Sequence, residues 1–440
     1  MAINRLKSLF DEGVFNQLGS KALNGDDLCG VITAFGYVQG EPCYAFSQDI
    51  NVKSGSLSKA GADKIKRIYD LAAKTGAPVI GIYDSLGADL TDGMQALNAY
   101  GELMLAVNNL SGVVPQIAVV AGVCASTAAM LAASADFVVM AKDAQMYVAP
   151  NAGENSADVC AKNGLAAIVC DTADSAIEAA RDLVTKLPIN NLSAVPVFEY
   201  SASSSNLGKT ACENALAICD EGSLTELYAD CGTASYTAIA TISGSTVGIV
   251  ATNKADSKLT SADCSKIARF VRTCDAFAIP VVTLVDTEGF EANAQTEAIG
   301  AVKDMAKLAN AYAEATTVKV SVVVGKAYGS AFIALAGKGA NADVTFAVDS
   351  AVIAPMAPLT AVEFFMHDKL SGAADVNAKR NELAAEYAKN EAGADKAAAA
   401  GAVDEVISAS DVRQCVSDAL DMLAGKRVTK LPKKHSNMPL

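Results

Sequence analysis

The stretch from Pro115 to Pro150 constrains the fold more than any other part of the chain. It reads PQIAVVAGVCASTAAMLAASADFVVMAKDAQMYVAP. An apolar run, a turn of small residues, an apolar helix-forming run and a second apolar run follow one another. This order predicts a buried strand, a tight turn, a buried helix and a second buried strand.

A membrane span is the alternative for part of this stretch. No Asp, Glu, Lys or Arg occurs from Leu103 to Ala135, and a run of that length can cross a bilayer. Asn108, Asn109 and Pro115 interrupt the run, however, and Ala and Gly outnumber Leu and Phe in it. The pattern favours a buried strand and helix of a globular domain over a transmembrane helix.

A weaker copy of the stretch returns at Val318–Pro355, as VKVSVVVGKAYGSAFIALAGKGANADVTFAVDSAVIAP. Both copies place small residues where a strand turns into a helix, at Ala125–Ala128 and at Gly329–Ala331. Backbone N–H groups at such a turn have no intrahelical partner and lie at the positive end of the helix dipole. They can bind an oxygen that becomes negative during a reaction. The alternative is that the small residues only allow helix and strand to pack closely.

Further landmarks recur at a nearly constant spacing of roughly 205 residues. The repeat predicts two homologous domains built from strand–helix units, an α/β fold, with residues 1–200 in the first domain and 201–440 in the second. The polar segment Ser201–Lys209 is the predicted linker. The paired landmarks are Glu12 and Glu221, the hairpin glycines Gly40 and Gly244, Asp84 and Asp286, and Pro150 and Pro355.

Local patterns predict several elements of these domains. They are a hairpin within Val31–Phe46, a helix over Ala60–Lys74 closed by Gly76, a strand at Pro78–Tyr83, a helix over Met94–Val107, a strand and helix within Ala161–Lys186, and a helical Ala373–Ser410. The basic run that closes the chain is expected to be a solvated tail. Asp84 and Asp286, after their strands, are expected to cap helices or turns rather than to do chemistry, and Cys124 is expected to pack in the core.

Composition excludes several classes of function. The net charge of −14 argues against a broad nucleic-acid surface. The cysteines form no C-x-x-C pair and the N-terminus shows no secretory segment, so a reduced, cytoplasmic setting is expected. Neither of the two histidines, His367 and His435, lies in a ligand cluster, so no metal is expected in this chain. No nucleophile elbow, P-loop or dinucleotide fingerprint follows a predicted strand.

Several stretches, in this order along the chain, resemble the carboxyltransferase subunit of biotin-dependent acyl-CoA carboxylases and the related decarboxylases. Besides the stretch from Pro115 to Pro150, they are YAFSQDINVKSGSLSKAGADKIKRIYDLAAKTGAPVIGIYDS, KLPINNLS, ARFVRTCDAFAIPVVTLVDTEGF, AKLANAYAEATTVKVSVVVGKAYGSAF and LPKKHSNMPL. The resemblance covers nearly the whole chain. It implies two tandem crotonase-like domains, each a ββα superhelix, usually assembled as a hexamer of two stacked trimers. The active site then lies where the N-terminal domain of one subunit meets the C-terminal domain of another.

The resemblance also implies roles for residues. N–H groups of Ser126, Thr127 and Ala128 hold the enolate of the acyl-CoA thioester. N–H groups of Gly329, Ser330 and Ala331 hold the ureido oxygen of biotin, which arrives as carboxybiotin on a separate carrier protein and also supplies the base. The predicted cofactor-binding residues are Tyr328, Gly329, Ser330, Ala331 and Ile333, and the predicted substrate-binding residues are Gly55, Ser56, Leu57, Ser85, Gly87, Ala88, Ser126 and Thr127.

The chain departs from the family at several of these positions. Where the family has Gly-Gly-Ala in the first turn, this chain has Ser126-Thr127-Ala128, and a β-branched threonine does not reach glycine-only conformations cheaply. A family arginine is replaced by Asp89. At a position that selects the acyl chain in the family, this chain has Ile333. These changes leave the identity of the acyl-CoA open.

Three functions follow in order of support. The first is an acyl-CoA carboxyltransferase whose partners are a biotin carboxyl carrier protein and either a biotin carboxylase subunit or membrane decarboxylase subunits, which would bring it to a membrane. The second is a divergent scaffold subunit that has lost the acyl-CoA site. A crotonase-type hydratase or isomerase is third, because it would need an acidic pair in one domain and would not explain the duplication. The direction of carboxyl transfer cannot be read from the residues.

Overall fold

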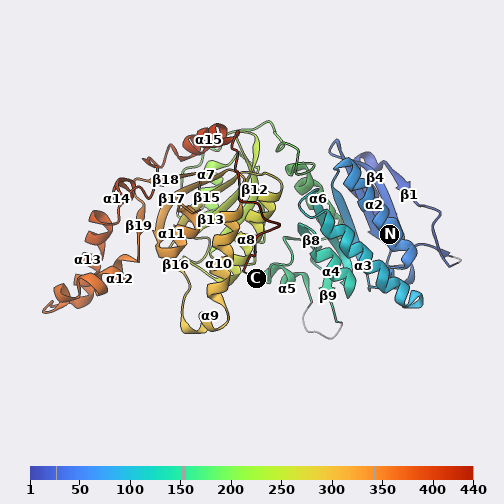
Figure 1. The fold of residues 1–440 in the computed structure, drawn as a ribbon, viewed down its shortest axis with the longest axis horizontal. Coiled ribbons are helices and arrows are strands. Elements are labelled where there is room, and N and C mark those ends of the chain that lie inside the picture. Colours follow the sequence, from blue (N-terminus) through green and yellow to red (C-terminus); the bar gives the residue numbers. More distant parts are fainter. Residues whose placement is uncertain (26, 150–154, 341, 440) are drawn as a thin grey trace. The chain divides into compact units, whose positions relative to one another are not determined.

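The computed structural model describes residues 1–25, 27–149, 155–340 and 342–439. The chain forms two compact units (Figure 1). The N-terminal unit comprises Met1–Pro196 with Leu227–Cys231, and the C-terminal unit comprises Val197–Glu226 with Gly232–Leu440. The predicted linker Ser201–Lys209 contains no helix or strand and belongs to the C-terminal unit. Pro150, one of the repeat landmarks, lies outside the described residues.

The N-terminal unit is built on one mixed sheet with the strand order β1-β4-β5-β6-β7-β8-β10 and with β9 paired to β7. The first three strands are antiparallel and all later pairs are parallel. The bounds are β1 Phe15–Leu18, β4 Val31–Val38, β5 Glu41–Gln48, β6 Val79–Ser85, β7 Gln116–Ala125, β8 Phe137–Ala141, β9 Gln145–Tyr147 and β10 Ile168–Cys170, with a separate pair of β2 Leu23–Asn24 and β3 Asp27–Leu28.

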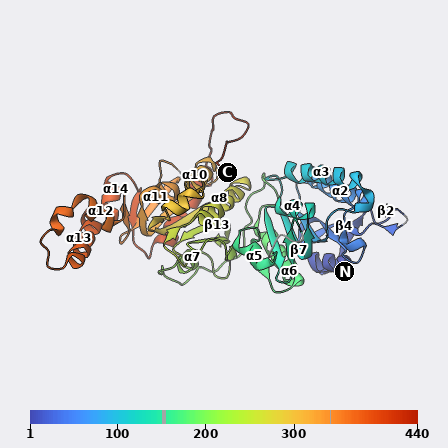
Figure 2. The same cartoon turned by 90° about the horizontal axis from the view of Figure 1, so that it is seen from below.

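Helices cover both faces of this sheet, α2 and α3 on one side and α6 on the other (Figure 2). The predicted helix over 60–74 is confirmed as α2, which starts after a Ser58 cap and ends at Gly76 with φ 68°. The helices are α1 Ala2–Leu9, α2 Lys59–Thr75, α3 Met94–Asn109, α4 Thr127–Ala133, α5 Ala157–Lys162 and α6 Ala173–Lys186, with short 3₁₀ turns η1 Asp11–Gly13, η2 Lys53–Gly55 and η3 Leu90–Asp92.

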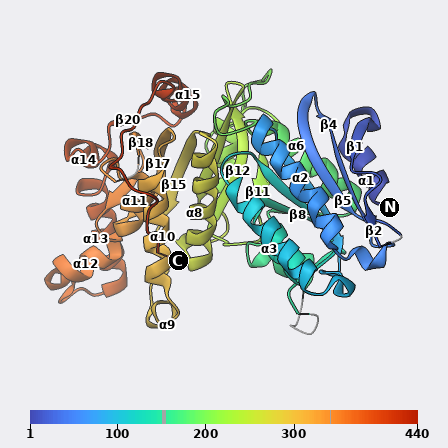
Figure 3. The same cartoon turned by 45° about the vertical axis from the view of Figure 1, so that its right-hand side comes forward.

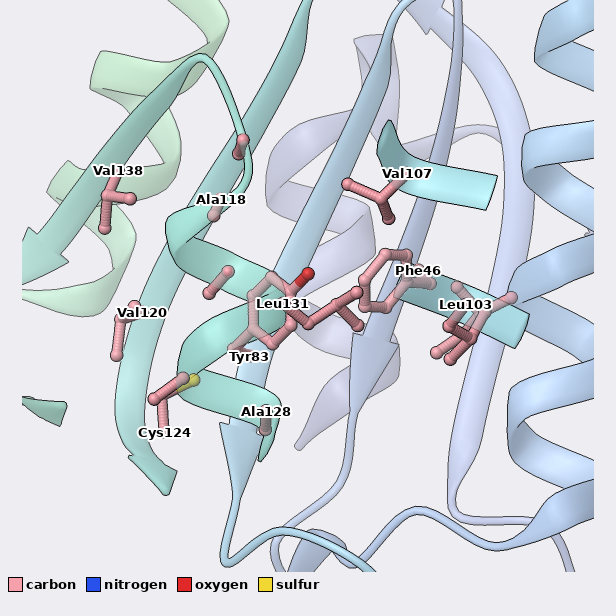
Figure 4. Packing of buried hydrophobic residues seen from close by; sticks show 14 of the residues in the cluster. Phe46, Tyr83, Leu103, Val107, Ala118, Val120, Cys124, Ala128, Leu131 and Val138 are labelled. Carbon is pink, nitrogen blue, oxygen red and sulfur yellow. The ribbon is translucent and has the colours of Figure 1, made fainter. Parts of the chain in front are cut away.

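The core of the unit lies between the sheet and the α2–α4 layer (Figure 4). The rings of Phe46 and Tyr83 meet edge to face with centroids 5.3 Å apart. Leu131 of α4 belongs to the same cluster, so the buried helix predicted from small residues is confirmed. Cys124 is fully buried there, as expected, and burial raises the pKa of its thiol. The helix that follows the first turn is therefore anchored by packing rather than by its own length.

The C-terminal unit repeats the same sheet, with the order β11-β12-β13-β15-β17-β18-β20 and with β19 paired to β17. Its β12–β13 pair is antiparallel and the pairs from β13 to β20 are parallel. The strands are β11 Thr225–Leu227, β12 Ser235–Ile242, β13 Ser245–Thr252, β15 Val281–Thr287, β17 Lys319–Tyr328, β18 Val344–Val348, β19 Val352–Ala354 and β20 Glu405–Ile407, besides the pair β14 Lys258–Leu259 and β16 Gly289–Phe290.

The helices of this unit include an added pair, α12 and α13, that lies beyond the sheet (Figure 3) and has a small apolar cluster of its own. The prediction that 373–410 is wholly helical is wrong, because β20 forms the last strand of the sheet. The helices are α7 Ala211–Ile218, α8 Ser261–Ala276, α9 Ala294–Ala298, α10 Ala301–Glu314, α11 Gly329–Ala336, α12 Pro358–Phe365, α13 Val376–Asn390, α14 Ala394–Ala399 and α15 Val412–Leu423, with η4 His367–Leu370.

The duplication extends to individual side chains. In the N-terminal unit, the Asp11 carboxylate accepts hydrogen bonds from the backbone N–H groups of Gln39 and Gly40, at 2.8 and 2.9 Å. Both turn residues have positive φ, as a two-residue hairpin requires. Arg181 of α6 donates to the same carboxylate at 2.9 Å. The hairpin turn is thereby fixed by a charge-assisted contact.

The C-terminal unit reproduces this arrangement with different residues around it. The Asp220 carboxylate accepts from the N–H groups of Ser243 and Gly244, at 3.1 and 2.8 Å, and pairs with Arg413 of α15 at 2.6 Å. The Gly40–Gly244 correspondence inferred from the sequence is confirmed, and both residues close equivalent β hairpins.

The basic end of the chain has no helix or strand in its described residues and is mostly exposed, as predicted for a solvated tail, but three of its lysines bind it to the C-terminal unit. Lys426 pairs with Asp343 at 2.8 Å and Lys433 with Glu314 at 2.6 Å. Lys430 donates to the carbonyl oxygen of Glu314, the last residue of α10. These cations gather at the C-terminal end of a helix, where the dipole favours positive charge.

Lys319 lies at the same helix end but is buried, and its ammonium group donates to the carbonyl oxygens of Tyr312 and Ala315 at 2.7 and 2.9 Å. Burial lowers the pKa of Lys319 from 10.5 to about 8. Between these two pH values the unfolded chain holds a proton on this amine that the folded chain has lost. The Lys319 contribution to the free energy of unfolding therefore increases with pH across this window.

We expect Lys319→Met to abolish that contribution. The free energy of unfolding, measured in urea at pH 8, 9 and 10, should rise less with pH, or fall more steeply with pH, in the variant than in the wild type. Lys303→Met, which alters an exposed lysine on α10, should keep the wild-type pH dependence. Equal pH dependence in Lys319→Met and the wild type would contradict the expectation.

Candidate active site

Two segments of the N-terminal unit that the sequence singled out lie together. The N–H of Leu57 donates to the carbonyl oxygen of Gly87 at 2.8 Å, and the N–H of Asp89 donates to the carbonyl oxygen of Leu57 at 2.9 Å. Gly55 lies so close to the end of β6 that a Cβ on it would be 2.0 Å from the carbonyl oxygen of Asp84. Gly55-Ser56-Leu57 and Ser85–Ala88 therefore form one continuous rim.

Ser85 and Gly87 give this rim its shape. The Ser85 hydroxyl is fully buried and accepts a hydrogen bond from the N–H of Gly87 at 3.0 Å. Gly87 has φ 109°, and a Cβ built on it would lie 3.2 Å from the Cβ of Ser126. The rim is thus in contact with the first turn, and Ser85 acts through the loop rather than by reaching an exposed surface.

The first turn joins β7 to α4, and Ser126 is its left-handed residue, with φ 58° and ψ −132°. Thr127 begins the helix, so the expectation that the conformational strain falls on threonine is wrong. The N–H of Ser126 donates to the carbonyl oxygen of Tyr147 in β9 at 2.8 Å. Of the three amides predicted to bind an oxyanion, those of Thr127 and Ala128 are left, because the first N–H groups of a helix have no intrahelical acceptor.

The C-terminal unit contains the counterpart of this rim. The hydroxyl of Thr287 accepts from the N–H of Gly289 at 3.2 Å, as Ser85 does from Gly87. The pairing of Leu259 with Phe290 and the bond from the N–H of Glu291 to the carbonyl oxygen of Leu259, 2.8 Å, match the contacts of Leu57.

The second turn joins β17 to α11 and has a glycine at the left-handed position. Gly329 has φ 59°, and a Cβ there would lie 3.2 Å from the carbonyl oxygen of Pro355. Ser330 is exposed and Ala331 is buried. The ring of Tyr328 packs against Ala354 and Ala392 instead of facing outward.

Ile333 lies one helical turn after Gly329 and is 55% exposed. Nearby, the ammonium group of Lys326 pairs with Glu288 at 2.7 Å, and this hydrogen bond raises the pKa of Lys326. Of the predicted cofactor residues, Ser330 and Ile333 are therefore exposed to a ligand and Gly329 is half-buried. Tyr328 and Ala331 are buried and support the turn by packing.

Asp84 fixes the strand that precedes the first turn. Its carboxylate accepts from the N–H of Val123 at 3.2 Å and from Arg5 of α1 at 2.8 Å. Gly122 lets it approach, since a Cβ there would lie 2.4 Å from the carboxylate oxygen. The expectation that Asp84 caps a helix or the turn after its strand is therefore wrong, because its carboxylate binds Val123 and Arg5 instead.

Asp286 has the same place before the second turn. Its carboxylate accepts from the N–H of Lys326 at 2.8 Å and lies against Gly325. Asn253 donates to it at 2.7 Å where Arg5 serves Asp84. Each aspartate thus holds the end of the strand that leads into a turn.

Sequence reasoning missed the side chains that join these segments over long range. Arg5 and Tyr147 carry no local pattern that reports their contacts. Asp89, the residue that replaces a family arginine, pairs with Lys53 at 3.2 Å and so links the two loops of the rim. The only sign of this ion pair in the sequence is that residues 53 and 89 carry opposite charges.

The described residues contain no group of three or more His, Cys, Asp or Glu side chains placed to hold a metal ion. Within the same residues, no helix is both long and apolar enough to cross a membrane.

Two homologous α/β units, each with a strand-to-helix turn that can present backbone amides, form the duplicated layout expected of a crotonase-like carboxyltransferase. The family of sequences described as "Carboxyl transferase domain" matches residues 1–438, and the chain belongs to this family. It is 35% identical to methylmalonyl-CoA decarboxylase subunit alpha of Propionigenium modestum, over 100% of this chain and 93% of that subunit. It is 34% identical to the methylmalonyl-CoA carboxyltransferase 12S subunit of Propionibacterium freudenreichii subsp. shermanii, over 100% and 91%.

Solved structures agree with this assignment. The crystal structure of a transcarboxylase 12S hexamer with methylmalonyl-CoA and methylmalonic acid bound superposes with a TM-score of 0.93 at 33% identity. The match covers 100% of this chain and 92% of that one. A single-chain long-chain acyl-CoA carboxylase shares the fold, with a TM-score of 0.84 at 21% identity over 95% of this chain and 45% of that one.

The buried contact between Arg5 and Asp84 yields a stability prediction. Arg5 is 8% exposed and Asp84 4%. Arg5→Met leaves a buried carboxylate without its cation, and we expect the free energy of unfolding to fall by about 3–5 kcal/mol. Lys66→Met, which breaks an exposed pair with Glu102 in the same unit, should leave the urea midpoint unchanged. An equally small shift for Arg5→Met would refute the role given to this pair.

Opposite substitutions at the left-handed positions of the two turns should have opposite effects on the free energy of unfolding. Gly329→Ala forces a Cβ into a conformation that costs about 1–3 kcal/mol, so urea unfolding should show a loss of that order. Ser126→Gly relieves the same strain, and its gain is smaller because glycine adds about 1 kcal/mol of unfolded-state entropy. Gly339→Ala, at a glycine without positive φ and with open space around it, is the control and should not lower the free energy of unfolding, because alanine there reduces the entropy of the unfolded chain.

Proposed function

We propose that the chain is a biotin-dependent carboxyltransferase. It moves a carboxyl group between carboxybiotin, held on a separate carrier protein, and a short-chain acyl-CoA. One observation carries the proposal: both homologous units present a turn of backbone amides with the same left-handed residue, φ 58° at Ser126 and φ 59° at Gly329. A reaction with two carbonyl oxygens that each gain negative charge needs two such turns.

In the N-terminal unit, the amides of Thr127 and Ala128 hold the thioester oxygen of the acyl-CoA as it becomes negative. The contact between Gly87 and Ser126 places the rim of residues 55–57 and 85–88 beside that oxygen. These residues orient the acyl group and keep water from it. Each amide donor lost from such a site costs on the order of 3 kcal/mol of barrier.

In the C-terminal unit, the amides of Gly329, Ser330 and Ala331 hold the ureido oxygen of biotin. The residues fit this group, because the glycine leaves the turn without a side chain and the exposed Ile333 offers an apolar surface next to it. Biotin, when bound, supplies the carboxyl group and the base. This accounts for the lack of an unpaired acid or base among the residues discussed at the second turn, where Lys326 and Glu288 bind each other.

The assembly proposed here is the hexamer named for the transcarboxylase 12S relative. In it, the N-terminal unit of one copy would face the C-terminal unit of another. The partners are a biotin carboxyl carrier protein and either a biotin carboxylase or membrane subunits of a decarboxylase, as the name of the Propionigenium relative suggests.

The proposal is tested with the full chain, free biotin and malonyl-, methylmalonyl- or glutaconyl-CoA, by following the loss of each thioester chromatographically. Ser330→Pro removes one amide donor at a helix start that accepts proline. We expect it to lower kcat about 100-fold, as about 3 kcal/mol implies. Ser330→Ala keeps the amide, and its kcat should exceed that of the proline variant by about the same factor.

Two results would contradict the proposal. Equal rates for the proline and alanine variants would remove the second turn from the reaction. No turnover of any of the three thioesters, in the chain or in its complex, together with no saturable binding of CoA esters by calorimetry, would favour a scaffold subunit.

A further inference from the structure

We propose that the side chain of Ser126 restricts the acyl site to thioesters whose α-carbon carries no methyl group, of the malonyl and acetyl kind, and disfavours methylmalonyl- and propionyl-CoA. The inference rests on the proposed function, because it concerns the substrate of the first turn. It goes against the names of the relatives, which refer to methylmalonyl-CoA.

The first step is the strain at Ser126. Ser126 and Gly329 have the same backbone angle at equivalent places, yet only glycine adopts it without strain. Strained non-glycine residues persist where the surroundings fix them, and they concentrate at functional sites. We therefore expect the Ser126 side chain, before that of any other residue in the first turn, to have a functional role.

The second step is where that side chain lies. A Cβ built on Gly87 would be 3.2 Å from the Cβ of Ser126 and 3.8 Å from its hydroxyl oxygen. The Ser126 side chain therefore occupies the space between the turn and the rim. The corresponding space in the C-terminal unit is open, since a Cβ built on Gly289 would meet only the carbonyl oxygen of Tyr328, at 3.8 Å.

The third step is that hydrogen bonds hold both walls of this space in place. The turn is tied to β9 by the bond from the N–H of Ser126 to Tyr147. The rim is tied by the bonds of Gly87 to Leu57 and Ser85. A fixed wall discriminates by size, because the bound group cannot push it aside.

The consequence concerns the carbon next to the thioester carbonyl. With the carbonyl oxygen on the amides of Thr127 and Ala128, the acyl chain begins beside Ser126. A methyl group on the α-carbon competes with the Ser126 side chain for the same volume. Discrimination by a single methyl group in a fitted pocket amounts to about 10–200-fold.

The test compares kcat/KM for malonyl-CoA and methylmalonyl-CoA, with free biotin and the full chain. The wild type should prefer malonyl-CoA by about tenfold or more. Ser126→Gly should reduce this preference at least about tenfold by raising the methylmalonyl-CoA value. Ser126→Ala keeps the Cβ and should keep the preference. Gln39→Gly relieves a positive φ of 49° in a hairpin of the same unit, and it should leave the ratio unchanged.

The outcomes separate this inference from the proposed function. A wild type that prefers methylmalonyl-CoA, or a Ser126→Gly variant with an unchanged ratio and intact thermal unfolding, overturns the inference while carboxyl transfer stands. A shift in Ser126→Ala as large as in Ser126→Gly assigns selectivity to the hydroxyl and overturns the steric argument. Absence of turnover with both thioesters overturns the inference and the proposed function together.

Discussion

The junction between a buried strand and a helix of small residues is the constraint on which both units depend. The chain must reverse there within one residue, and that residue must take a positive φ, at Ser126 in one unit and at Gly329 in the other. The reversal leaves the first amides of the helix without acceptors. The backbone of the turn therefore supplies hydrogen-bond donors, and no side chain has to provide them. Asp84 and Asp286 accept hydrogen bonds from the N–H groups of Val123 and Lys326 and so fix the strand ends that lead into the turns.

The two units satisfy that shared geometry with different residues, and the differences indicate where they diverged. Arg5 supports Asp84 by a buried charge pair, whereas Asn253 supports Asp286 by a neutral amide. Asp84 is buried and Asp286 half-buried, and the charge of each carboxylate needs partners because leaving it uncompensated is destabilising, most strongly for the buried one. The support could therefore change chemistry between units, but it could not be lost. At the left-handed position no such demand operates, and one unit has serine where the other has glycine.

The sequence could predict what depends on local chemistry. The helix α2 follows from its apolar spacing, its Ser58 cap and Gly76, and the hairpins follow from Gly40 and Gly244. The repeat placed Asp84 and Asp286 in register, and the small residues located both turns. Contacts between distant segments gave no such signal. Arg5 reaches Asp84 across 79 positions and Lys433 reaches Glu314 across 119, and nothing near either residue reports the partner. The position of β20 depends likewise on a neighbouring strand and not on its own short sequence. Which residue of the turn bears the strain could not be predicted either, because it depends on where the helix begins.

If the reacting oxygens are held by main-chain amides, as we propose, then the functional groups of this chain are invisible to a comparison of side chains. Only the residues that shape the amides can be compared. This fits a chain that retains the fold of the transcarboxylase 12S subunit with a TM-score of 0.93 at 33% identity. Replacing the side chains of a turn leaves its donors in place and alters the space in front of them. Substitution at Ser126 and Thr127 would therefore change which acyl group fits before it changes whether an oxyanion can be stabilised. In a family built this way, the substrate is expected to vary more readily than the reaction.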